Sequence, residues 1–206
     1  MHTVIADYKD PASGFTDRLK DVLQNGISWS STEEMHKIFT REEAGWNVNV
    51  VFHKEYRGDT CIGIGCVADQ DIAAGELIRK GIFGKNLFMF NKDINLPNPK
   101  LIDTINYLKN YAFRCPCHQF SPTSVGDDLA VFVPGNSHNH SDDPNVIEKC
   151  HENGVDVYAS KNILKGESVR VNYSTYGNSP KWFTEYLKDG LGESDCVFYG
   201  SNDYVK

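Results

Sequence analysis

A nine-residue pattern occurs twice in this chain of 206 residues, and its spacing limits the folds that the chain can adopt. Residues 68–76 share alanine, isoleucine, glycine and glutamate, at identical spacing, with residues 159–167. Each copy is typical of a strand, a tight turn at Gly-Glu and a second strand. Two copies are too few for a repeat protein. The pattern therefore favours short, non-alternating β-hairpins over a parallel sheet with crossover helices.

Hydrophobic periodicity predicts the other elements of a mixed, mainly β chain. Strands are expected at residues 46–53, 61–81 (as strand, turn, strand), 129–133, 155–160 and 168–173, with a turn at residues 57–59. Helices are expected at residues 15–23, after a capping box at Ser31, at residues 98–113 and at residues 179–190. The stretch NHSDDPN, residues 139–145, is a loop in which proline disfavours helix and the asparagines and aspartates favour turns.

Charge and composition exclude some classes of function. The formal net charge is -7, which argues against a protein that coats nucleic acid and would suit a lysine-rich peptide partner. No apolar run approaches the length of a membrane span, and no secretion signal is recognisable at the start. We therefore expect an intracellular protein, in the nucleus or the cytoplasm, whose six cysteines are reduced thiols.

Three segments in a fixed order resemble the SET-domain family of protein lysine methyltransferases over about residues 61–177. The first is GIGCVADQDIAAGELI with its Gly-x-Gly turn, the second is NHSDDPN, and the third is GESVRVNYSTYG. The resemblance implies a β-clip fold of short antiparallel sheets with a pseudoknot, in which the C-terminal strand passes under the loop that holds Asn139. It divides the chain into an N-terminal helical extension (1–45), a SET domain (46–178) and a C-terminal helix and tail (179–206).

The resemblance also implies S-adenosylmethionine as the methyl donor and a protein lysine, with a histone tail as one candidate, as the acceptor. Tyr173 is the predicted catalytic residue, because methyl transfer to an amine is an in-line displacement that a fixed phenol can align. The predicted cofactor-binding residues are Gly63, Ile64, Gly65, Asn139, His140, Tyr173 and Trp182. Tyr111 and Tyr176 are weaker candidates for a wall of the lysine channel.

Each of these residues also has a purely structural interpretation. Gly63 and Gly65 fit a β-bulge, and Asn139 and His140 fit hydrogen bonding to buried loop backbone. Tyr173 fits ring packing in a strand. Trp182 fits the apolar face of a C-terminal helix at least as well as a cofactor contact.

The chain departs from the family pattern at several positions. Asp142 stands where the family has a zinc-binding cysteine, and the tail has only Cys196, so no zinc cluster of that kind is expected. The run Cys-Pro-Cys-His at residues 115–118 has no second pair of cysteines to complete a tetrahedral site, which favours loop thiols. Val171 stands where an aromatic residue would limit methylation, which predicts di- or trimethylation. Asn172 replaces aspartate, and no basic residue precedes Gly63.

Two functions from different classes, and a third related to the first, remain open at this point. The first is an S-adenosylmethionine-dependent lysine methyltransferase, favoured by the intact Gly-x-Gly, Asn-His and tyrosine. The second is a catalytically silent SET-like module that binds a peptide or partner. The third is an enzyme of the same fold that acts on a small molecule, because a fold does not determine a function.

Overall fold

The computed structural model describes residues 4–5, 40–57, 59–93, 108–109, 111–114, 118–119, 127–132, 135, 138–176 and 179–191. In these residues strands predominate and helices are few, which confirms the predicted mainly β class. The elements are β1 (Val4–Ile5), β2 (Val50–Arg57), β3 (Thr60–Ala68), β4 (Leu77–Ile82), β5 (Leu87–Phe90), β6 (Phe113–Arg114), β7 (His118–Gln119), β8 (Leu129–Phe132), β9 (Asn139–His140), β10 (Val146–His151), β11 (Gly154–Ala159), β12 (Arg170–Val171), the 3₁₀-helix η2 (Tyr173–Thr175) and α4 (Lys181–Leu191).

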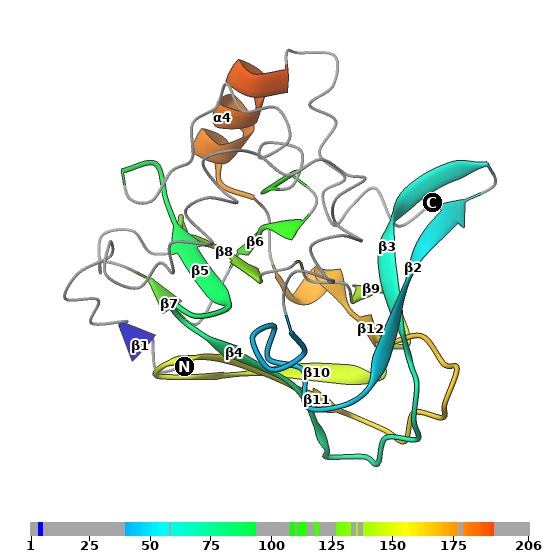
Figure 1. Cartoon of the computed structure of the whole chain (residues 1–206). Coiled ribbons are helices and arrows are strands. Elements are labelled where there is room, and N and C mark those ends of the chain that lie inside the picture. The colour runs from blue at the N-terminus through cyan, green and yellow to red at the C-terminus, as the bar shows by residue number, and fades with distance from the viewer. Residues whose placement is uncertain are drawn as a thin grey trace.

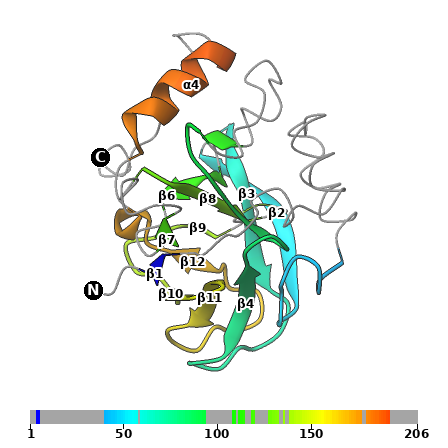
Figure 2. The ribbon, with the colours of Figure 1, turned by 90° about the vertical axis from the view of Figure 1, so that its left-hand side faces the viewer.

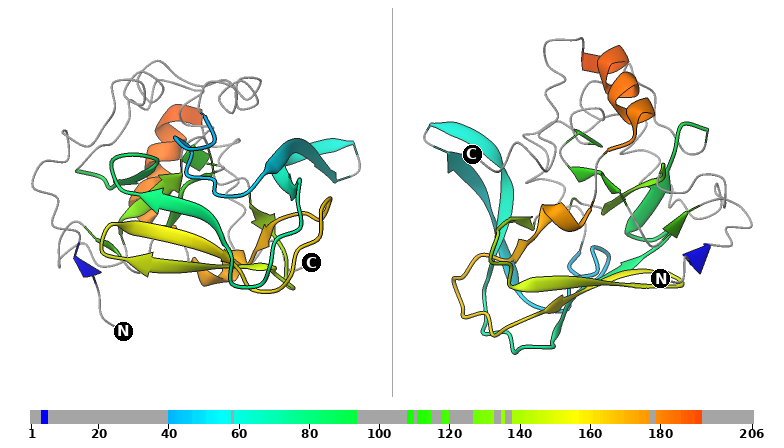
Figure 3. Two further views of the ribbon diagram at one scale, coloured as in Figure 1. Left: turned by 60° about the horizontal axis from the view of Figure 1, so that its bottom comes forward. Right: turned by 180° about the vertical axis from the view of Figure 1, so that it is seen from behind.

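The strands form small sheets rather than one large one. The sheet β10-β11-β4 runs along the bottom of Figure 1, and the long hairpin of β2 and β3 rises beside it. The third sheet, β5-β8-β6, lies between that bottom sheet and α4. Side and rear views place α4 at the opposite end of the molecule from β10 and β11 (Figures 2 and 3). All three sheets are antiparallel, whereas β9 pairs with β12, and β1 with β7, in parallel.

The core lies where these sheets face one another. Ile78 of β4, Phe132 of β8 and Val157 of β11 are fully buried within one hydrophobic cluster. The side chains in β5 and β8 are buried at every position, so these strands have no solvent-facing side, as the apolar run at residues 129–133 predicts.

The two copies of the repeated pattern pair with each other, not within themselves. Strands β3 and β4 flank the first Gly-Glu turn without pairing, so the predicted hairpins are wrong although the strands and turns are present. Equivalent backbone hydrogen bonds join the copies in both directions: Ala68 N to Glu167 O and Ala159 N to Glu76 O (both 2.9 Å), Ile72 N to Ile163 O (2.8 Å) and its reverse (2.9 Å), and Gly75 N to Ala159 O (2.8 Å) and Gly166 N to Ala68 O (2.7 Å).

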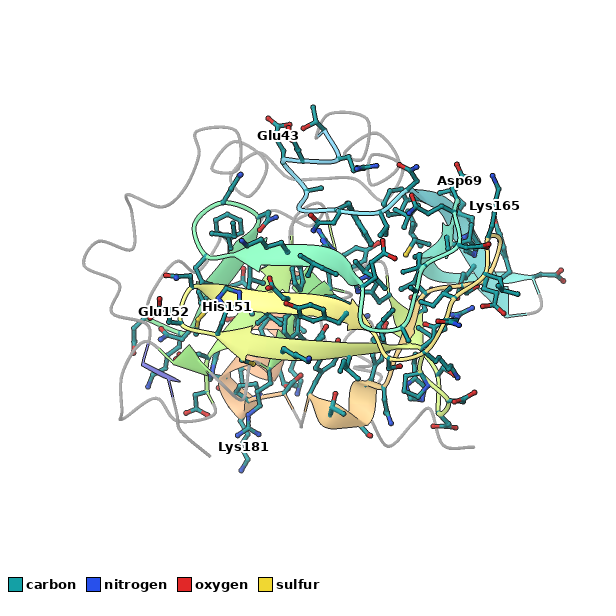
Figure 4. All side chains as sticks on the ribbon, turned by 90° about the horizontal axis from the view of Figure 1, so that it is seen from below. Glu43, Asp69, His151, Glu152, Lys165 and Lys181 are labelled. Atoms are coloured by element: carbon teal, nitrogen blue, oxygen red, sulfur yellow. The ribbon has the colours of Figure 1, made fainter. Side chains whose placement is uncertain are left out.

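Side chains complete this two-fold arrangement. Glu76 and Glu167 each accept a hydrogen bond from a backbone N–H three residues earlier, which closes the two turns in the same way. Gly75 and Gly166 both have positive φ, of 84° and 89°, which glycine adopts without strain. Asp69 and Lys165, which lie next to each other in Figure 4, form a salt bridge of 2.9 Å across the junction.

Other predicted boundaries differ in detail. The alternation that begins at Trp46 predicts a strand from that residue, but the ladder of β2 begins at Val50, and Trp46 makes only an isolated bridge to Arg79. The predicted C-terminal helix is present as α4 and continues one residue past Gly190. The predicted helices before residue 40 lie outside the described residues, as does most of the one at 98–113. Among the described residues, no helix has the length and apolar character that crossing a bilayer requires.

Two cysteines have a described state. Cys66 is a buried free thiol, and burial raises its pKa to about 12, so it stays protonated at neutral pH. Cys150 is in a disulfide. The expectation of reduced thiols throughout is therefore wrong at Cys150, where the sequence offered no signal for pairing.

Candidate active site

The first wall of the candidate site is the hairpin of β2 and β3, which carries the two predicted glycines. Gly63 lies opposite Glu55, and Gly65 lies opposite His53, in the antiparallel register. Directly opposed residues point to the same face of a hairpin, so Glu55 and His53 lie on the face where the glycines have no side chain. The register shifts between Glu55 and Tyr56, so a bulge, the structural interpretation of these glycines, is also present next to Gly63.

Close packing of the Glu55 carboxylate, and beyond it of Asn139 on β9, explains why residue 65 is glycine. A Cβ atom there would clash with Glu55 Oε1 and would lie 3.0 Å from Asn139 Nδ2. Asn139 Nδ2 is itself buried and has no hydrogen-bond partner among the described residues. A buried unpaired donor costs about 1–3 kcal/mol, so this amide is suited to a ligand that brings an acceptor. Ile64, the third predicted residue of this segment, is buried on the other face of the strand.

The second wall is the parallel pair of β9 and β12, seen in the middle of Figure 1. Asn139 lies opposite Arg170, and His140 lies opposite Val171. The backbone N–H of Ser141 donates to the Val171 carbonyl (2.9 Å), which extends the pairing into the loop. The C-terminal segment therefore runs alongside the loop that contains Asn139, as the predicted pseudoknot requires.

Asn145, the last residue of NHSDDPN, holds this arrangement together and was given no role from sequence. Its side chain donates from Nδ2 to the Ser168 carbonyl and accepts at Oδ1 from the Arg170 N–H, both at 2.8 Å. Its backbone N–H donates to the Arg170 carbonyl (3.1 Å). The side chain of Asn145 thus pairs with backbone groups of both Ser168 and Arg170, which explains why the loop ends in an asparagine. From sequence alone, an asparagine after proline indicates only a turn.

Tyr173 follows β12 directly and is fixed by two hydrogen bonds. Its N–H donates to His140 Nδ1 (3.1 Å), and its hydroxyl donates to the His138 carbonyl (3.1 Å). The rings of Tyr173 and His140 lie 5.4 Å apart, tilted by 41°. The half-buried phenol is thus anchored to the same strand that carries Asn139, which brings the predicted catalytic residue to the predicted cofactor residues.

Two departures from the family pattern have local explanations. Because His140 accepts at Nδ1, its proton resides on Nε2, which lies 3.2 Å from Asp142 Oδ1. Asp142 thus orients a histidine of the site. Asn172 caps η2 by accepting from the Ser174 N–H (2.9 Å), a task that asparagine and aspartate perform equally well.

A row of aromatic rings leads away from Tyr173. Tyr176 lies 5.7 Å from Tyr173 and 5.0 Å from Phe113, which in turn stacks on Phe132 at 6.0 Å. The Tyr176 hydroxyl donates to Glu148 Oε1 (2.7 Å). Burial raises the pKa of Glu148 to about 7, against the opposing effects of the Tyr176 hydrogen bond and of Arg79. The row of rings is thus joined to a carboxyl group that changes its charge near neutral pH.

His138 and Arg79 support the loop from the inside. Both are fully buried, and Arg79 donates to the carbonyls of Ala44 (3.0 Å) and Gly135 (2.7 Å). Burial, with a further contribution from Arg79, lowers the pKa of His138 to about 3, so His138 is neutral at physiological pH. Its ring packs edge-on against Trp46 at 5.3 Å.

An ion pair that sequence inspection did not identify lies at the junction of the two walls. Arg170 Nη1 contacts Glu55 Oε2 at 2.9 Å, and His53 Nε2 lies 3.3 Å from Glu55 Oε1. The side chain of Glu55 is 11% exposed and that of Arg170 28%. The two residues are separated by 115 positions, so only the register of both strand pairs brings them together.

The remaining predicted residue, Trp182, contacts a different region. It lies on α4, donates from Nε1 to the Asp127 carbonyl (2.9 Å) and packs against Phe90 of β5 at 6.3 Å. These contacts match the structural interpretation of an apolar helix face, and none of them involves β3, β9 or β12. The predicted channel residue Tyr111 is buried, and its ring lies against Gly135.

Within the described residues, no group of three or more histidine, cysteine, aspartate or glutamate side chains could hold a metal ion. A cavity of about 360 Å³ lies on the other face of β2, and none of the predicted site residues lines it. Its lining residues are Arg41, Ala44, Trp46, Asn49, Val50, Phe52 and Asp69.

A family model described as the SET domain matches residues 63–174, which is more than half of the chain. The match includes the second wall, β9 and β12, and the part of β3 from Gly63 onward. The predicted domain of residues 46–178 encloses this match, while its exact limits stay a prediction. The chain matches no curated protein sequence at significant similarity.

Three solved structures resemble this chain at low sequence identity. Polycomb Repressive Complex 2 from Chaetomium thermophilum has 21% identity over 68% of this chain and a TM-score of 0.43. A Plasmodium falciparum protein provisionally described as a histone methyltransferase has 19% identity over 62% of this chain and 94% of its own, with a TM-score of 0.41. KRYPTONITE, in complex with mCHG DNA and SAH, has 16% identity over 66% of this chain and 26% of its own, with a TM-score of 0.42. This chain spans 17% of the first of these, and TM-scores below 0.5 add nothing to the family match.

Proposed function

Since the chain belongs to the SET-domain family, we propose that it is a methyltransferase that uses S-adenosylmethionine to methylate the ε-amine of a protein lysine. The observation that carries the proposal is the meeting of Gly65, Asn139 and Tyr173 through the parallel pair of β9 and β12. These residues are far apart along the chain, and a merely structural hairpin would not require that they converge.

The residues present fit the cofactor on two counts. Asn139 offers a buried amide donor without a partner, which suits an acceptor on the methionine end of the cofactor. Gly65, which has no side chain, lets the Glu55 carboxylate and Asn139 Nδ2 pack closely against the strand, so these polar groups lie together where the ligand would bind. Bound there, S-adenosylmethionine would supply a methyl group activated by its sulfonium.

Tyr173 is the group that we assign to the acceptor amine. Its backbone and hydroxyl are both held, so the ring keeps one position, and a fixed oxygen can align an amine for in-line attack. Oxygen dipoles around the transferred methyl group stabilise the positive charge that it carries in the transition state. The amine must be neutral to attack, and the aromatic surface of Tyr176 and Phe113 lowers the pKa of a lysine by desolvation.

The proposed class of acceptor rests on the charge of the chain. The net charge of -7 suits a lysine-rich segment, and mixed histones offer a convenient source of such segments. Val171, buried at the position of the limiting aromatic residue, supports di- or trimethylated products.

Calorimetric titration with S-adenosylmethionine and a methyl-transfer assay on mixed histones test the proposal. Tyr173→Phe is expected to lose at least about 100-fold in rate, the scale of a positioned catalytic group, while it keeps cofactor binding. Full activity in Tyr173→Phe would remove the tyrosine from the chemistry. Cofactor binding without transfer to any protein would favour an enzyme for small molecules, and no binding at all would favour a silent module.

A further inference from the structure

One charged pair in the site has no role in the function proposed above. Arg170 and Glu55 contact each other at 2.9 Å where the hairpin of β2 and β3 meets β12. Gly65 and Asn139 lie at the same point, because a Cβ on Gly65 would touch both Glu55 Oε1 and Asn139 Nδ2. The pair therefore lies beside the unpartnered amide of the candidate cofactor site.

The backbone holds both charges in place. Arg170 is paired with Asn139 in the parallel ladder, and its N–H donates to Asn145 Oδ1. Glu55 lies opposite Gly63 in the hairpin and has His53 Nε2 at 3.3 Å from Oε1. A charged pair fixed on two strands, rather than on mobile loops, is the arrangement that recognition of a small ligand requires.

The contact with Glu55 uses only part of the hydrogen-bonding capacity of Arg170. A guanidinium has five N–H donors, and among the described residues the guanidinium of Arg170 contacts one side chain, that of Glu55, through Nη1. The side chain of Arg170 is 28% exposed, so a ligand can reach it. One cation, one anion and the amide of Asn139 are thus presented together beside Gly65, whose missing side chain lets Glu55 Oε1 and Asn139 Nδ2 approach the same point.

We propose that Arg170 and Glu55 recognise the zwitterionic α-amino-acid end of the methyl donor, an inference that rests on the function proposed above. Arg170, together with Asn139 Nδ2, receives the α-carboxylate, and Glu55 receives the α-ammonium. Arginine suits the first task because its planar fork matches a carboxylate. One cation and one anion together match the charges of a zwitterionic amino-acid end.

Two ligands that differ only in that end test the inference. S-Adenosylhomocysteine carries the amino-acid moiety, whereas 5′-methylthioadenosine has the adenosine and sulfur without it. In calorimetric titrations, Arg170→Met is expected to weaken S-adenosylhomocysteine by about 10- to 100-fold, the range for a hydrogen bond to a charged group, and to leave 5′-methylthioadenosine within about twofold of the wild type. Glu55→Gln is expected to act in the same selective direction with a smaller factor, since the amide still accepts one hydrogen bond.

Controls separate recognition from structure. Lys161→Met breaks an exposed ion pair with Asp143 (2.7 Å) in the same region, and it should change the affinity of neither ligand. The double variant with Glu55→Gln and Arg170→Met leaves no unpaired charge, so it keeps the test usable if Arg170→Met alone unfolds, and thermal unfolding monitored by circular dichroism reports this. It should show the same selective loss.

Equal weakening of both ligands, or no weakening, in the Arg170 and Glu55 variants would show that the pair is structural and overturn the inference. A wild-type chain that binds neither nucleoside instead rejects the proposed function, and the inference falls with it. The wild-type titration alone therefore separates a failure of the inference, in which the wild type still binds, from a failure of the proposed function, in which it does not.

Discussion

Replacing Glu148 with glutamine removes a carboxyl group whose pKa is raised by burial from 4.5 to about 7. In the folded chain this carboxyl keeps its proton until the pH approaches 7, whereas in the unfolded chain it loses the proton near 4.5. Between these two values the unfolded state binds fewer protons than the native state, so the free energy of unfolding decreases as the pH rises. Below 4.5 and above about 7 the carboxyl contributes no further slope.

The magnitude follows from the same two values. At about 1.4 kcal/mol for each pH unit, ionising Glu148 across this interval costs the fold about 3 kcal/mol, and less where solvent reaches the half-buried side chain. Glutamine stays neutral at every pH and can still accept the hydrogen bond of the Tyr176 hydroxyl. Glu148→Gln should therefore gain about 2–3 kcal/mol relative to the wild type on going from pH 4.5 to pH 8.

Urea denaturation of both proteins at half-unit pH steps measures this difference, and groups that titrate equally in both proteins cancel. Tyr176→Phe serves as a second variant: it removes a hydrogen bond that lowers the pKa of Glu148, so the midpoint of the pH dependence should rise. A stability difference between wild type and Glu148→Gln that is the same at pH 4.5 and pH 8 would show that the carboxyl is not desolvated and refute the reasoning.

Three further outcomes are expected. Gly65→Ala should fold, because the atoms that its Cβ meets belong to the ends of two side chains, but it should lose S-adenosylhomocysteine binding in calorimetry; unchanged affinity would exclude a ligand there. Gly75→Ala and Gly166→Ala should each cost about 1–2 kcal/mol in urea denaturation, since the space around both is open and only the positive φ is strained, and unequal costs would contradict the two-fold arrangement. Lowering the pH from 6.5 towards 3 should destabilise the wild type more than His138→Gln, because the unfolded histidine takes up a proton that burial denies to the native one; parallel curves in chemical denaturation would argue against this.

Strands and turns could be predicted from the sequence, but their partners could not. The repeated pattern correctly places strand ends and turns at Gly75 and Gly166, because glycine at positive φ is a local requirement. It does not reveal that the copies pair with each other, since the choice of a hydrogen-bonding partner is made between distant segments. Likewise the alternation from Trp46 reports which side chains are buried, and Trp46 is indeed 4% exposed, but it does not report where the ladder begins.

In the candidate site, too, local motifs could be predicted from the sequence and contacts between distant segments could not. Gly65, Asn139 and Tyr173 belong to motifs that can be recognised in the sequence, and the structure brings them together. Arg170 lies within the third family segment and Glu55 lies outside all three. Neither received a role from the sequence, because their contact depends on the register of two separate strand pairs. Residues whose role arises from long-range register are inaccessible to local patterns, however strong the motifs beside them are.

The repeated pattern and the site are linked by one stretch of backbone. Where the copies meet, Val67 bridges Ser168, and the N–H of Val169 donates to the Cys66 carbonyl (2.9 Å). Continuing this antiparallel register by one residue places Gly65 opposite Arg170, which accounts for the meeting of Arg170 with Glu55 above that glycine. The hydrogen bonds between the copies therefore set the distance between the glycine strand and β12. The repeated pattern at residues 68–76 and 159–167 is therefore also the scaffold that aligns the two walls of the site.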